Sequence, residues 1–180
     1  MKKFSIIFLG ILMIGCASNN SVVVNTKQGN SVDDLIQNKS FEITSNWAAP
    51  RAVKLGTLIP IGGGSPANIA ITGTVNYLKL NGDNVNASLP YFGELQNGKG
   101  FNTKKTGIVF NGTPEDYTVI YNDKKKFHKV QFKIVEDNEV YNVTVRLYNN
   151  LSSRIHVFST HRSSILYTGV VNELSDLASD

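Results

Sequence analysis

The feature of this chain that most constrains its fold is a strict alternation of apolar and polar side chains in its second half. The clearest case covers residues 141–147, where Asn142, Thr144 and Arg146 are the polar residues. The apolar residues of the same segment are Tyr141, Val143, Val145 and Leu147. A period of two places these apolar side chains on one face of a β-strand, so we predict that this face points into the core.

Short turn signals separate other segments of the same kind. Asn-Gly-Asp at 81–83 is typical of a tight hairpin, and Asp-Asn at 137–138 and Asn-Asn at 149–150 can adopt left-handed turn conformations. A further strand is predicted over 69–75, where alternate residues share one parity. No helical pattern long enough for a parallel crossover lies between the predicted strands. We therefore predict a mainly β fold, with one antiparallel meander forming a curved sheet, a sandwich or a partly open barrel.

One short helix is predicted before the first strand. Ser31 is a suitable N-cap, and Asp33 and Asp34 favour the positive end of a helix dipole. Leu35 supplies an apolar contact, and the helix is expected to end near Asn38.

The N-terminus has the organisation of a bacterial lipoprotein signal. Lys2 and Lys3 form a basic region, residues 4–14 are apolar, and Gly15 precedes Cys16, the only cysteine in the chain. The apolar segment is too short to span a bilayer comfortably. Because lipid is attached to such proteins through sulfur, we predict that Cys16 carries a membrane anchor. The alternative is an ordinary cleaved signal peptide in which the cysteine is incidental.

The signal sets the expected division of the chain. We predict four parts: a signal peptide over 1–15, a flexible tether over 16–30, a β-rich domain over 31–172 and a C-terminal tail over 173–180. No aspartate follows Cys16 closely, and no acidic cluster is present there. By analogy with known sorting signals, we expect a lipoprotein of the outer membrane that faces the periplasm.

The charge of the chain does not indicate a nucleic-acid partner. The formal net charge of +4 includes Lys2 and Lys3, which are removed with the signal, so the mature chain is nearly balanced. Three consecutive lysines over 124–126 are expected to form the solvated tip of a hairpin. With no cysteine available for a disulfide, the fold must depend on its own core.

The residues that often carry catalysis are not brought together by the sequence pattern. His156 and His161 lie on opposite parities of a predicted strand, so they cannot bind one metal ion without a bend. Asp33 and Asp34 fit helix capping, and a lipidated Cys16 leaves no thiol nucleophile. We therefore predict no catalytic residues, no metal and no cofactor, and a protein that is not an enzyme.

Two segments combine aromatic residues with proline or glycine. The first, Leu-Pro-Tyr-Phe-Gly at 89–93, ends a predicted strand, and Gly93 is expected to permit a positive φ. Tyr91 and Phe92 are expected either to close one end of the core or to line the mouth of a pocket.

The second segment begins at Arg162 and continues through Tyr167 to Gly169. Arg162 is expected to pair with a carboxylate or with backbone carbonyls, and a ligand anion is the alternative. The candidate ligand-binding residues are Tyr91, Phe92, Arg162 and Tyr167.

The chain resembles a Bacteroidales lipoprotein family described as domain of unknown function 4251. The resemblance is carried by these two segments, by Phe-Glu-Ile at 41–43 and by Gly-Ile-Val-Phe at 107–110. The resemblance extends over nearly the whole mature chain. It implies a secreted, lipid-anchored, β-rich domain. It implies no catalytic residues, because the family has no assigned activity.

Three classes of function remain open. The first is a non-catalytic binding module for a small apolar or amphipathic ligand, and the second is a scaffold that docks an envelope protein through a sheet edge or an aromatic patch. An enzyme is the third. A carrier is expected to leave a lined cavity, whereas a scaffold fills its core.

The lipid anchor is directly testable. Metabolic labelling with an alkyne fatty acid should label the wild-type protein and should not label Cys16→Ser, because the variant lacks the sulfur that accepts the lipid. Equal labelling of the two proteins would place the lipid elsewhere.

Overall fold

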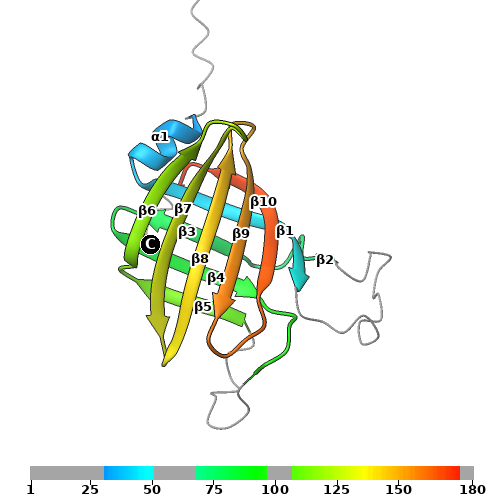
Figure 1. The fold of residues 1–180 in the computed structure, drawn as a ribbon. Coiled ribbons are helices and arrows are strands. Elements are labelled where there is room, and N and C mark those ends of the chain that lie inside the picture. The colour runs from blue at the N-terminus through cyan, green and yellow to red at the C-terminus, as the bar shows by residue number, and fades with distance from the viewer. Residues whose placement is uncertain (1–30, 51–67, 97–106, 175–180) are drawn as a thin grey trace, which may run out of the picture.

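The computed structural model describes residues 31–50, 68–96 and 107–174. The predicted signal peptide, Cys16, the tether and most of the C-terminal tail lie outside these ranges. The described residues form one short helix and a series of β-strands (Figure 1). In chain order the elements are α1 (Val32–Gln37), β1 (Ser40–Pro50), β2 (Ile69–Ala70), β3 (Tyr77–Asn81), β4 (Asn84–Pro90), β5 (Gly107–Gly112), β6 (Glu115–Asn122), β7 (Phe127–Glu136), β8 (Glu139–Tyr148), β9 (Ser152–Ser159) and β10 (Ile165–Asn172).

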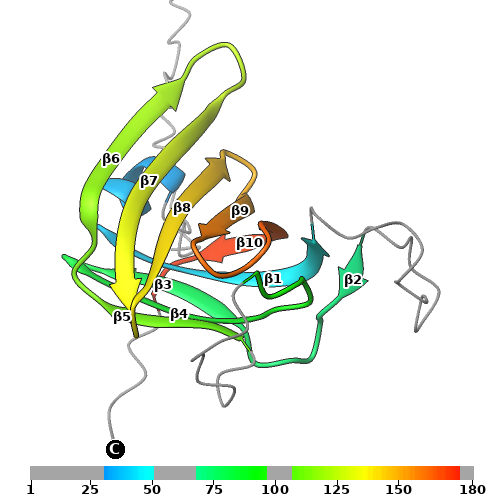
Figure 2. The ribbon, with the colours of Figure 1, turned by 60° about the horizontal axis from the view of Figure 1, so that its bottom comes forward.

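The strands form one antiparallel sheet that is curled into a half-barrel (Figure 2). Its strand order is β5-β4-β3-β1-β10-β9-β8-β7-β6, and β2 also pairs with β1. Two runs of sequential strands, β3–β5 and β6–β10, are joined by β1, which pairs with both β3 and β10. The mainly β fold with an antiparallel sheet and one short helix, as predicted, is confirmed.

The core lies on the concave side of this sheet, where the two runs of strands face one another. The ring of Phe110 on β5 lies 6.3 Å from that of Phe132 on β7 and 5.5 Å from that of Tyr141 on β8. Strands β5 and β6 are at opposite ends of the strand order, so contact between β5 and β7 requires the sheet to curl.

The alternation predicted over 141–147 is confirmed. Strand β8 pairs with β7 on one side and with β9 on the other. Thr144 is half-buried, and Asn142 and Arg146 are exposed. The apolar side chains of the strand are all buried: Tyr141, Val143, Val145 and Leu147.

Helix α1 has the capping that the sequence predicts. The Ser31 hydroxyl accepts a hydrogen bond from the Asp34 backbone N–H, and the Asp34 carboxylate accepts one from the Ser31 backbone N–H. Leu35 is buried in the core. His128 Nε2 on β7 lies 2.7 Å from Asp33 Oδ1, so an ion pair joins the helix to the sheet when the histidine is protonated. Helix α1 lies at the end of the half-barrel where β6 leads into β7 (Figure 1).

The turns agree with the prediction at two hairpins and differ at a third. Gly82 and Asp83 join β3 to β4, and Gly82 has a φ of 59°. Between β7 and β8, Asp137 and Asn138 have φ values of 49° and 65°, as expected for a tight hairpin turn. Between β8 and β9 the left-handed residue is Leu151, with φ 62°, and the prediction for Asn149-Asn150 is therefore wrong. This loop has three residues, and in such loops the third position takes the left-handed conformation.

The strand predicted over 69–75 is much shorter in the structure. Pairing stops at Ala70, and Val75 is 84% exposed. The side chain of Asn76 then takes the place of a strand backbone: its Oδ1 accepts from Ser45 N at 2.7 Å, and its Nδ2 donates to Ser45 O at 3.0 Å. The register of β1 with β10 shifts between Ser45 and Trp47, so Asn76 satisfies backbone groups beside a bulge.

The register of β8 predicts opposite results for two neighbouring substitutions. Val145→Asp should lower the free energy of unfolding by about 3–5 kcal/mol, because an unpaired charge replaces a fully buried side chain. Thr144→Asp, which changes the outer face of the same strand, should alter it by less than about 1 kcal/mol. Urea unfolding followed by Trp47 fluorescence measures both values, and equal losses would contradict the register.

Candidate functional site

The two segments with aromatic motifs lie side by side in the structure. After β4 the chain forms an antiparallel bridge with the segment before β10, in which Leu95 pairs with Arg162. The Ser163 backbone N–H donates to Glu94 O at 3.0 Å. Residues that are far apart in the sequence are thus held together by backbone hydrogen bonds.

Arg162 is at the centre of this arrangement. It is 4% exposed, and its Nε lies 3.0 Å from Glu139 Oε1 and 3.2 Å from Glu139 Oε2. Glu139, the first residue of β8, is 2% exposed. The guanidinium carbon of Arg162 lies 5.2 Å from the centre of the Tyr91 ring. Of the two predicted pairings, the structure shows a carboxylate partner.

Glu139 joins several donors into one buried network. The Tyr141 hydroxyl donates to Glu139 Oε2 at 2.7 Å, and the Ser159 hydroxyl donates to Oε1. Burial, and then the hydrogen bond to Glu139, raises the pKa of Tyr141 far above its usual value. Sequence reasoning did not single out Glu139. The sequence does contain an indication of this role. Glu139 lies on the same inward face of the strand as Tyr141 and Val143, and a carboxylate on that face requires a buried partner.

Tyr91 holds the loop after β4 through its hydroxyl group. That oxygen lies 2.9 Å from Glu94 O, 3.0 Å from Ser163 O and 2.8 Å from Ser163 Oγ. Burial raises the pKa of Tyr91. A Cβ at Gly93 would overlap both the Tyr91 hydroxyl and Ser163 Oγ. The requirement for glycine is therefore a close approach, and the positive φ predicted for Gly93 is not observed.

The remaining two candidate residues differ in their exposure. Tyr167 is fully buried, and its hydroxyl donates to Pro90 O at 2.8 Å. Phe92 is 37% exposed and Leu95 is 51% exposed. The structure thus gathers Tyr91, Arg162 and Tyr167 into the support of one loop, and that loop presents Phe92 and Leu95 at the surface.

The histidines and the lysine-rich turn do not form a further cluster. His128 faces Asp33, and the ring centre of His156 lies 4.1 Å from that of Phe158. Lys126 pairs with Asp123 at 2.6 Å in the turn between β6 and β7. Across the described ranges, no group of three or more His, Cys, Asp or Glu side chains is placed to hold a metal ion. None of the helices described there is long and apolar enough to cross a membrane.

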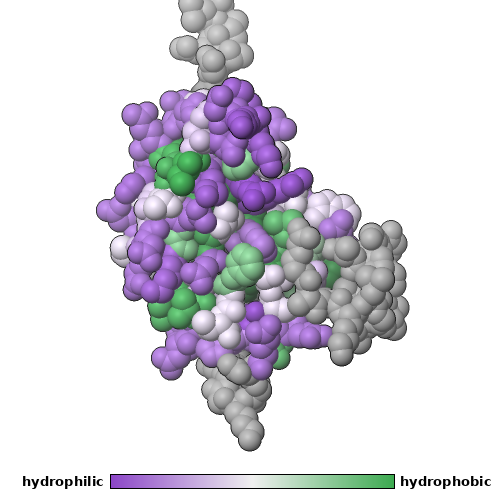
Figure 3. Space-filling view, in the orientation of Figure 1, coloured by the Kyte–Doolittle hydropathy of each residue, from purple (hydrophilic) through white to green (hydrophobic). Residues whose placement is uncertain are grey.

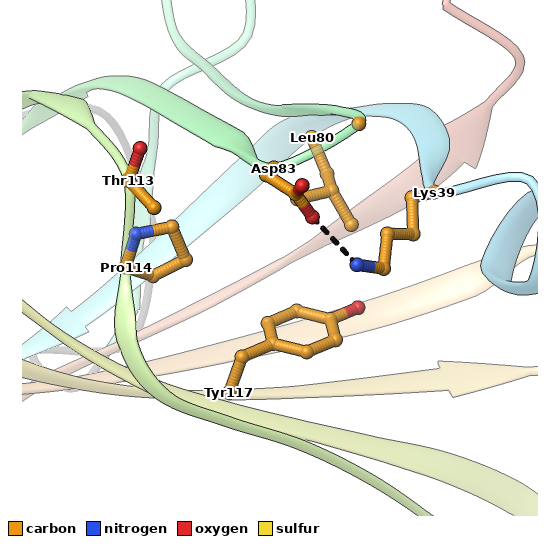
Figure 4. A pocket seen from close by; sticks show the side chains of 7 residues that line it. Lys39, Leu80, Asp83, Thr113, Pro114 and Tyr117 are labelled. Atoms are coloured by element: carbon orange, nitrogen blue, oxygen red, sulfur yellow. Dashed lines mark hydrogen bonds and ion pairs between the residues drawn. The ribbon is translucent and has the colours of Figure 1, made fainter.

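A small cavity of about 140 Å³ lies between the β3–β4 turn and the start of β6 (Figure 4). Lys39 Nζ lies 2.7 Å from Asp83 Oδ1 at its edge, and this interaction lowers the pKa of Asp83. The Tyr117 hydroxyl is buried without a hydrogen-bond partner among the described residues, and burial raises its pKa. The volume is below the range of about 300–1,000 Å³ typical of ligand pockets. Its lining residues are Lys39, Leu80, Gly82, Asp83, Thr113, Pro114 and Tyr117.

The fold and the joined motifs define a β-rich half-barrel domain in which a buried ion pair fixes a surface loop. The chain belongs to the family described as domain of unknown function DUF4251, which matches residues 24–171. It is similar in structure to a DUF4251 family protein from Bacteroides eggerthii DSM 20697, with a TM-score of 0.53 and 12% sequence identity. That similarity covers 77% of this chain and 82% of the other, and at this identity it shows the fold alone. No curated protein matches the chain.

The buried ion pair predicts a large effect of removing one partner. Arg162→Met should lower the free energy of unfolding by about 3–5 kcal/mol, because the Glu139 carboxylate is left buried without its cation. The double variant Arg162→Met/Glu139→Leu should recover part of this loss. Urea unfolding measures both, with the exposed Arg154→Met as the control, expected to lie within about 0.5 kcal/mol of wild type. Wild-type stability of Arg162→Met would contradict the structural role.

Proposed function

We propose that this protein is a non-catalytic binding module of the bacterial cell envelope, anchored by lipid on Cys16. In this proposal it contacts an apolar or amphipathic ligand through Phe92 and Leu95. The observation that carries the proposal is the fixed presentation of these two side chains by the loop after β4. The N-terminal signal pattern supports the anchor, and the residues after Cys16 favour the outer membrane, facing the periplasm.

The support of the loop explains why its surface residues could act in binding. Tyr91 anchors the loop at three oxygen atoms, and Tyr167 holds the Pro90 carbonyl at its base. A loop fixed in this way loses little conformational freedom when a ligand binds. Phe92 and Leu95 add apolar contact area on that fixed backbone, and an aromatic ring does so with few rotatable bonds.

The proposal of a non-catalytic role rests on how the buried polar groups are used. Arg162 and Glu139 neutralise one another. The hydroxyls of Tyr141 and Tyr167 donate to acceptors within the protein, and burial raises the pKa of both well above the usual value. Groups that are occupied and hard to ionise are suited to support rather than to proton transfer.

A scaffold function is the alternative, and the edge strand β6 favours it. Three consecutive residues of β6 are large, apolar and substantially exposed: Val119 at 39%, Ile120 at 52% and Tyr121 at 44%. Among the described strands, β6 pairs only with β7. Exposed apolar edges are commonly blunted or covered in natural proteins, so a partner strand could add here.

Binding of a dansyl-labelled fatty acid distinguishes between the two candidate surfaces, the loop with Phe92 and the edge strand β6. Phe92→Ser should weaken binding about tenfold, because a large apolar contact is lost. Val75→Ser, at an apolar residue that is 84% exposed, is the matched control and should bind as wild type does. Fluorescence titration measures affinity, and thermal unfolding checks that each variant is folded. Loss of binding only in Ile120→Lys would move the contact to β6, and unchanged binding in all variants would contradict the proposal.

A further inference from the structure

The outer face of β7, β8 and β9 carries a groove of about 420 Å³ that is separate from the Phe92 surface. Lys129, Arg146 and Arg154 line it, and the lining contains no carboxylate. Figure 3 views the molecule with these strands toward the reader, and hydrophilic side chains are spread over that face between separate apolar patches.

The three cations are neighbours in the sheet. Lys129 on β7 is opposite Arg146 on β8, and Arg146 is opposite Arg154 on β9. Directly opposite side chains have Cβ atoms about 4.5–5.5 Å apart, and like charges at that spacing destabilise a sheet. In the part of the chain that the structure describes, no carboxylate forms an ion pair with any of the three. The fold therefore holds an uncompensated row of positive charge.

The adjacent cross-strand row is polar and neutral or weakly basic. Gln131, Thr144 and His156 are opposite one another on the same three strands. Gln131 Nε2 donates to Thr144 Oγ1 at 3.3 Å. Gln131 and Thr144 line the groove beside the cations, so an anion bound there would also meet uncharged hydrogen-bonding groups.

One of the cations is held in place before any ligand arrives. The Arg146 guanidinium carbon lies 5.4 Å from the centre of the Phe127 ring, and Phe127 is only 6% exposed. A cation–π contact of this kind restricts the guanidinium and so reduces the entropy lost on binding.

We propose that this groove binds a phosphorylated ligand that carries at least two negative charges. Two arginines and a lysine match the oxygen atoms of phosphate groups, because each guanidinium can donate two parallel hydrogen bonds. The groove volume lies within the range of about 300–1,000 Å³ found for ligand sites. A soluble phosphorylated molecule and a phospholipid headgroup share this chemistry.

The lysine-rich turn between β6 and β7 provides a matched control. Lys124 and Lys125 are exposed and belong to the same hairpin as β7, but they do not line the groove. Replacing them removes the same net charge as replacing Arg146 and Arg154. A difference between the two double variants therefore reports the groove and not the charge of the whole protein.

The test is isothermal titration of inorganic pyrophosphate into the full chain in uncharged maltoside micelles. The variant Arg146→Gln/Arg154→Gln should bind about tenfold more weakly or not at all, because two charge-assisted contacts are lost. The control Lys124→Gln/Lys125→Gln should bind within about twofold of wild type, because these side chains are outside the groove. The arginine variant should melt close to wild type, because relief of the repulsion between like charges offsets the lost contact between Arg146 and Phe127.

A second arm replaces pyrophosphate with maltoside micelles that contain cardiolipin, a phospholipid whose headgroup carries two phosphates. Binding to pyrophosphate alone supports a soluble ligand, and binding to the lipid micelles alone supports a headgroup, provided that the arginine variant loses it. Equal losses in the arginine and lysine variants would overturn the proposal, as would failure of the wild-type protein to bind either probe.

Discussion

The pairing of β1 with β10 is the interaction on which the rest of the structure depends. It joins β3–β5 to β6–β10, and without it the chain would form two smaller sheets with separate edges. The two strands come so close that a Cβ at Gly169 would overlap the backbone of Thr44 and Ser45. Asn76 completes the hydrogen bonds of Ser45 at the same place. The curl of the sheet, the core and the positions of both aromatic motifs follow from this junction.

The ion pair between Arg162 and Glu139 has a different role. It fixes the position of the loop after β4 more than it adds to the stability of the fold. Burying two charges carries a desolvation cost that their attraction only partly offsets. The buried Glu139 carboxylate fixes the position of the Arg162 side chain. The β-bridge between Leu95 and Arg162 then aligns the loop after β4 with this ion pair. The motif residues thus build a support, and the exposed Phe92 is the member of the set that is free to meet another molecule.

Local sequence patterns predicted most helices and strands, but they did not predict contacts between residues that are far apart in the sequence. The parity of 141–147 and the capping of α1 depend on neighbouring residues, so the sequence shows them directly. The pairing of β1 with β10 has no connecting turn to set its register. At Asn76 a side chain replaces a strand that periodicity favoured, which no period-two pattern can reveal. Arg162 was expected to pair with a carboxylate, and Glu139 was detectable by its inward parity. That these two residues are partners was not predictable, because the contact exists only in the folded chain.

The open side of the half-barrel has a consequence for motion. Among the described strands, β5 and β6 each have a hydrogen-bonded neighbour on one side only, and the contact across the gap is made by side chains such as Phe110 and Phe132. Separating aromatic rings breaks no backbone hydrogen bonds, so opening this side requires less free energy than separating two paired strands. Amide hydrogens along these two strands are therefore expected to exchange with solvent sooner than those of β1 and β10, each of which is hydrogen-bonded to a neighbouring strand on both sides.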